Sequence, residues 1–82
     1  MRILDEDSNK SLKNLQILLT RDEVNELIDS LQAILRKGVS QSHSHINDKE
    51  YQHEITVAIY DEGNLQNNCF HSRIVELIQN DL

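Results

Sequence analysis

Residues 42–60 read SHSHINDKEYQHEITVAIY, and this stretch decides how the second half of the chain folds. Two alternating runs flank the polar group Asn47–Glu50, whose composition is typical of a turn. We therefore expect strands over His43–Ile46 and Tyr51–Tyr60, joined as a hairpin. In the second strand the side chains alternate between an apolar face that includes Ile59 and a face that ends at Tyr60.

The same alternation places polar side chains together on the hairpin. If Ile46 lies opposite Tyr51, then His43 lies opposite Glu54 and both share a face with His45. Two imidazoles and a carboxylate are ligands for zinc or another divalent ion, so His43, His45 and Glu54 form a candidate metal site. A pairing shifted by one residue would move Glu54 to the other face, and solvated surface histidines are the favoured alternative. A pH-responsive contact is a third.

The segment before the hairpin predicts a helix. Thr20-Arg21-Asp22-Glu23 has the spacing of a capping box, in which the first and last side chains bond to each other's backbone amides. Apolar residues follow at steps of three and four: Val24, Leu27, Ile28, Leu31, Ile34 and Leu35. We expect a helix over Asp22–Lys37 that packs this stripe against a core and ends before Gly38.

The two ends of the chain carry weaker patterns. A polar turn within Asp5–Ser11 separates two short apolar segments, which predicts a hairpin of strands Met1–Asp5 and Leu12–Leu19. Near the C-terminus an amphipathic pattern predicts a helix over Asn68–Asn80. Its apolar stripe consists of Phe70, Ile74, Leu77 and Ile78. Its candidate N-cap is Asn67 or Asn68.

These elements predict one small α+β domain over residues 1–82, with the order ββαββα. We expect a two-layer sandwich: a small sheet of up to four strands with two helices on one face. A right-handed crossover through the first helix would bring Leu12–Leu19 parallel to His43–Ile46.

Composition argues against several classes of partner. Fourteen acidic and eight basic residues give a formal net charge of −6, which disfavours binding to nucleic acid. The start, MRILDEDSNK, lacks the apolar core of a signal peptide, and no apolar run has the length of about 20 residues needed to span a membrane. The single cysteine, Cys69, suits a reducing compartment. We expect a cytoplasmic protein.

Motifs for catalysis are missing from the sequence. There is no phosphate-binding loop, dinucleotide fingerprint or G-x-S-x-G motif. Cys69 and His71 have the residue types of a thiol nucleophile and its base, but two residues apart at a helix start their side chains diverge. We expect no enzyme and no cofactor other than the divalent ion considered above; a metal-dependent enzyme is a minor alternative.

The segment from Leu19-Thr20 through Glu23, with His43-Ser44-His45-Ile46 and the later Glu54-Ile55 and Ile59-Tyr60, resembles small uncharacterised proteins of Gram-positive bacteria. Those chains combine a helix opened by LTxxE with HxHI and EIxxxIY strands. The resemblance covers about two-thirds of the chain. It implies a bacterial, cytoplasmic, non-enzymatic protein and carries no catalytic residue.

The leading hypothesis is a non-enzymatic protein–protein interaction module, with a homodimer as its simplest form. The polar face of the second strand bears Thr56, Ala58 and Tyr60, a composition suited to an interface. One alternative is a metal-binding protein that uses the His-x-His hairpin. Another is an inhibitor or immunity-type protein whose negative charge attracts a basic partner.

Overall fold

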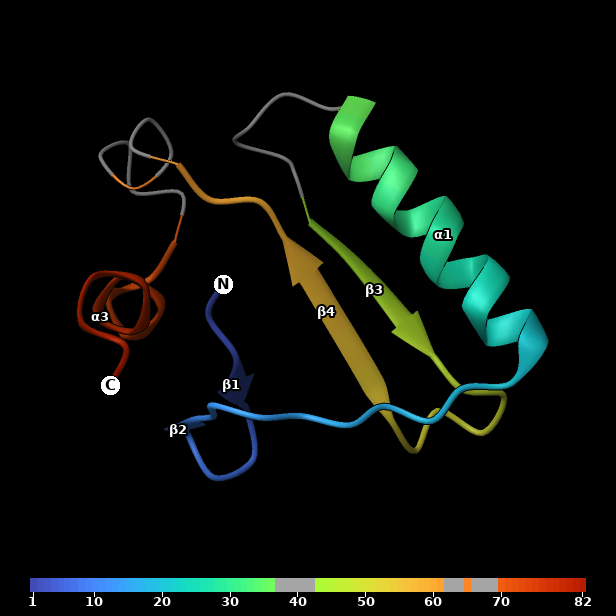
Figure 1. Ribbon diagram of the computed structural model, residues 1–82, viewed down its shortest axis with the longest axis horizontal. Coiled ribbons are helices and arrows are strands. Elements are labelled where there is room, and N and C mark those ends of the chain that lie inside the picture. The colour runs from blue at the N-terminus through green and yellow to red at the C-terminus, as the bar shows by residue number, and fades with distance from the viewer. Residues whose placement is uncertain (37–42, 62–64, 66–69) are drawn as a thin grey trace.

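The computed structural model describes residues 1–36, 43–61, 65 and 70–82 (Figure 1). In chain order the elements are β1 (Leu4–Asp5), β2 (Lys10–Ser11), α1 (Arg21–Arg36), β3 (His43–Asn47), β4 (Glu54–Ala58) and α3 (Ser72–Asn80). The predicted α+β class and the order ββαββα are confirmed. In Figure 1, α1 lies on one side of the β3–β4 hairpin and α3 lies on the opposite side, beyond β4.

The capping box fixes the start of α1 as predicted. The Thr20 amide donates to Oε1 of Glu23 at 2.9 Å, and the Glu23 amide donates to Oγ1 of Thr20 at 3.2 Å. These bonds satisfy two amides that the first turn leaves without helical partners. The helix runs from Arg21 to Arg36, and Lys37 and Gly38 lie outside the described residues.

The β3–β4 hairpin forms with a register that differs from the predicted one. Ile46 lies opposite Ile55 and not opposite Tyr51, so the pairing is shifted by four residues. The turn is longer than predicted because Oδ1 of Asp48 accepts the amides of Gln52 and His53, at 2.8 and 3.4 Å. This closed loop takes up the first residues of the predicted second strand, and β4 begins only at Glu54.

A shift by an even number of residues leaves each side chain on its predicted face. The face toward α1 is apolar, with Ile46 buried and Ile55 and Val57 half-buried. Helix α1 contacts β3 and contributes Ile34, which is 4% exposed. Burying these side chains between helix and hairpin provides the local core.

The N-terminal strands form a separate sheet. Strands β1 and β2 pair antiparallel, with Leu4 opposite Ser11, and in the described chain they do not join β3 and β4. The predicted strand Leu12–Leu19 is wrong. The strand that pairs with β1 is β2, which ends at Ser11, and residues 12–19 form no strand. The parallel pairing of that segment with β3 is therefore wrong as well. Alternation at Leu15 and Ile17 had indicated a half-buried strand, but both side chains are exposed.

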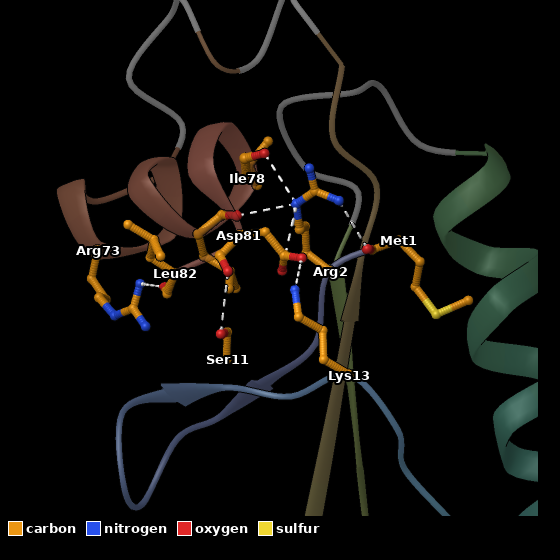
Figure 2. A network of polar contacts seen from close by, with 9 residues as sticks. Met1, Arg2, Ser11, Lys13, Arg73, Ile78, Asp81 and Leu82 are labelled. Atoms are coloured by element: carbon orange, nitrogen blue, oxygen red, sulfur yellow. Dashed lines mark hydrogen bonds and ion pairs between the residues drawn. The ribbon is translucent and has the colours of Figure 1, made fainter.

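Helix α3 begins at Ser72, later than the predicted Asn68, and His71 is its N-cap. Asn67 and Asn68 lie outside the described residues. Leu77 and Ile78 are buried as the pattern predicts. The two helices do not share one sheet face, since α3 is held to the N-terminal segment through polar contacts (Figure 2).

The core that results is small. Among the described residues four apolar side chains are buried: Ile34, Ile46, Leu77 and Ile78. The accessible surface is 6552 Å², whereas a compact chain of 9.5 kDa exposes about 5,000 Å². The radius of gyration is 13.4 Å, against about 12 Å for a compact domain of this length. The chain therefore exposes about 1,500 Å² more than a compact monomer.

Candidate functional site

The outer face of the hairpin, directed away from α1, carries the histidines. His43 lies opposite Ala58, and His45 lies opposite Thr56. Glu54 lies opposite Asn47, which makes it the diagonal neighbour of His45. The predicted set His43, His45 and Glu54 therefore shares one face, although the pairing that brings it together differs from the predicted one.

His45 is held by two oxygen atoms. Its Nδ1 lies 2.8 Å from Oε1 of Glu54 and 2.8 Å from Oγ1 of Thr56. Because an ionised carboxylate only accepts hydrogen bonds, Nδ1 is the donor and its hydrogen is shared between the two oxygens. The ring of His43 stands edge-on to that of His45, with centroids 5.6 Å apart. The result is an oriented imidazole on a solvent-exposed strand face.

The geometry does not assemble a metal centre from these side chains. In the part of the chain that the structure describes, no group of three His, Cys, Asp or Glu residues is placed to hold a metal ion. The Nδ1 atom of His45 is already bonded to Glu54. Coordination through Nδ1 would therefore require displacing that bond, which leaves Nε2 as the ring nitrogen of His45 that could bind a cation.

The turn of the hairpin contains a second imidazole–carboxylate pair, which sequence reasoning missed. Nδ1 of His53 lies 2.6 Å from Oδ2 of Asp48. The pKa of Asp48 is lowered from its ordinary value of 3.8, first by the hydrogen bond from His53 and then by the amide of Gln52. An aspartate at the start of a polar turn is the signal that predicts such side-chain to backbone bonds.

A shallow hollow of about 410 Å³ lies between α1 and the end of β3. Glu26 and Asp29 of α1 line one wall, and the strand segment 45–47 together with Tyr51 lines the rest. Its walls are polar, whereas small-molecule pockets are mainly apolar with a few placed polar groups. The hollow therefore offers hydrogen-bonding groups without an enclosed binding cavity.

The largest feature that the sequence misassigned is an exposed apolar row on α1. The row consists of Val24, Ile28, Leu31 and Leu35, which are 42%, 45%, 42% and 75% exposed, and we call it the α1 stripe. The sequence had placed these residues in a core together with Leu27 and Ile34. The sequence carries no signal for this outcome, because an apolar arc of this width is typical of a helix packed on a core.

The predicted interface residues lie on or near the hairpin's outer face. Thr56 and Ala58 are exposed on β4, and Tyr60 is 39% exposed just beyond the strand. Thr56 is engaged by His45, as described above. The outer face is thus accessible but polar, in contrast to the α1 stripe.

No protein-family model, curated protein or solved structure matches the chain. Within the described ranges, no helix combines the length and the apolar character that crossing a membrane requires.

Proposed function

We propose that the chain is a non-enzymatic protein–protein interaction module that docks through exposed apolar surface. The observation that carries this proposal is the α1 stripe, four large side chains in a continuous row on a regular helix. Contiguous exposed apolar patches on small soluble proteins mark interaction sites more often than isolated apolar side chains do.

The small core supports the same proposal. With four buried apolar side chains in the described part of the chain, the hydrophobic contribution to folding is modest for 82 residues. Binding of a partner to the native state adds to its stability by mass action. Because its own core contributes little, the chain gains stability when the α1 stripe is buried against another protein.

An apolar fluorescent dye tests the proposal directly. At a dilution where the mass is that of one chain, the folded protein should bind the dye and enhance its fluorescence. The double variant Ile28→Ser with Leu31→Ser should lose most of this enhancement, because it removes the centre of the stripe. Far-UV circular dichroism confirms that α1 remains helical in the variant.

A matched control leaves the stripe intact. Ala58→Ser changes an exposed position on the hairpin's outer face and should leave dye binding unchanged. If the folded single chain binds no dye, or if the double variant binds as much as the original, the α1 stripe is not an available docking surface and the proposal fails.

A further inference from the structure

We infer that the α1 stripe pairs with the α1 stripe of a second copy of this chain, the two helices lying antiparallel about a two-fold axis. This inference rests on the proposed function and names the partner. It places the contact on α1 and not on the outer face of the hairpin.

The spacing of the stripe is self-complementary. Its residues follow one another at steps of four, three and four, so the row reads the same from either end of the helix. An antiparallel two-fold axis midway between Ile28 and Leu31 sets Ile28 against the partner's Leu31 and Val24 against the partner's Leu35. Such a contact is isologous, with each pairing occurring twice, as closed dimers require.

Charge also permits two copies to meet at this face. A net charge of −6 on each chain opposes self-association unless the contact avoids acidic residues. With 100° of rotation per residue, the neighbours of the stripe on its outer flank are Arg21, Asn25 and Gln32. The acidic residues Glu26 and Asp29 lie on another side of the helix, where they line the hollow beside β3.

The exposed area of the chain exceeds that of a compact monomer of its size. A stable protein–protein contact buries about 800 Å² on each partner. The chain as a whole exposes about 1,500 Å² beyond the value for a compact monomer, and the α1 stripe contributes to that exposed area. An antiparallel arrangement also sets the two helix dipoles in the favourable relative orientation.

Sedimentation equilibrium over a range from low to high micromolar chain concentration tests the inference. The original chain should change from a single-chain mass to twice that mass, and Leu31→Glu should stay at the single-chain mass throughout. Leu35→Glu, at the most exposed position of the stripe, is the second variant should Leu31→Glu fail to fold. Ala58→Glu places the same charge on the hairpin's outer face and should dimerise like the original.

A mixing experiment tests the antiparallel geometry. Ile28→Lys and Leu31→Glu should each be monomeric, yet an equimolar mixture should form a heterodimer, because the two new charges face each other once and the native pair remains on the other side of the axis. A mixture of Ile28→Lys with Ile28→Glu should stay monomeric, since antiparallel helices do not set position 28 against itself. If a heterodimer forms in the second mixture and not in the first, the two helices are parallel and the geometry inferred here is wrong.

The outcomes separate this inference from the proposed function. A single-chain mass at every concentration, with dye binding that depends on the stripe, would overturn the second copy as partner while the interaction module stands. Loss of the dimer in Ala58→Glu but not in Leu31→Glu would move the contact to the hairpin and overturn the inference. A monomer whose dye binding does not depend on the stripe would remove both.

Discussion

Arg2 and Asp81 join the two ends of the described chain. Nε of Arg2 lies 3.9 Å from Oδ1 of Asp81, and it donates to the carbonyl oxygens of Leu77 and Ile78 at 3.1 Å each (Figure 2). The carbonyls of the last turn lie at the negative end of the helix dipole, so a guanidinium is favourable there. The Leu77 carbonyl also accepts the amide of Asp81 at 2.8 Å. Asp81 itself ends α3 in the left-handed conformation, with a φ of 55°.

The first prediction concerns this contact. Arg2→Met keeps the aliphatic stem but removes the charge and the donors, and we expect it to lower the free energy of unfolding by about 1 kcal/mol. Urea denaturation at fixed chain concentration measures the change. Arg2→Lys should give an intermediate value, because an ammonium supplies charge without the guanidinium's fixed geometry. Equal stability of all three chains would show that the contact contributes nothing.

A second prediction follows from three aspartates. The pKa values of Asp5, Asp48 and Asp81 all lie below the ordinary 3.8, owing mainly to hydrogen bonds from Ser8, His53 and Lys13 respectively. Because the unfolded chain binds protons more readily than the folded one, the stabilising contribution is present above pH 3.8 and is lost as the pH falls through the folded values. Urea midpoints should therefore drop as the pH is lowered below about 4.

Asp81→Asn is the matched control for the acid effect. Asparagine keeps the shape and tolerates the left-handed conformation, but it cannot ionise. The variant should be less stable than the original at neutral pH and should approach it at low pH. A difference that stays constant across the titration would mean that the charge of Asp81 is not what stabilises the end of α3.

The third prediction addresses the start of α1. Thr20→Ala removes the oxygen that accepts the Glu23 amide, and it should cost about 1 kcal/mol of stability. Thr20→Ser keeps the oxygen and should be close to the original. Thermal unfolding followed by the helical far-UV signal compares the three. If alanine is tolerated as well as serine, the capping box does not stabilise the helix.

The fourth prediction concerns the turn between β3 and β4. Tyr51 is 80% exposed and has a φ of 54°, a conformation that costs a non-glycine residue about 1 kcal/mol. Asparagine adopts it more readily, so Tyr51→Asn should raise the stability of the chain. Gln52→Asn, at the next position of the same turn and without a positive φ, should bring no such gain. A destabilised Tyr51→Asn would mean that the tyrosine ring makes a contact worth more than the backbone preference.

The fifth prediction concerns metal ions at the hairpin. Since the described side chains gather no three ligands, we expect EDTA and stoichiometric zinc to leave the thermal midpoint unchanged. Zinc should also leave the NMR ring signals of His43 and His45 in place. A zinc-dependent rise in stability that disappears in His43→Ala would contradict this and would restore the metal-binding alternative.

Local signals predicted the best-defined elements well. The start of α1 was predicted to within one residue, because the capping box of Thr20 and Glu23 specifies a helix start through local bonds alone. The faces of the hairpin were likewise determined by alternation, and the even shift in register preserved them. His45 and Glu54 therefore share a face as the pattern indicated, but the histidine that contacts Glu54 is His45 and not the predicted His43.

The burial of each apolar side chain depends on which other elements pack against it, and this was decided by the tertiary structure. Periodicity states that Leu15, Ile17 and the α1 stripe are apolar, but it does not state how much sheet is present to cover them. The first hairpin ends at Ser11 and forms its own sheet, and on α1 beside the β3–β4 hairpin only Ile34 is buried, with Leu27 half-buried. The sequence by itself determined where the apolar side chains stand along each element. Only the packing decided which of them are buried, because burial requires a second surface.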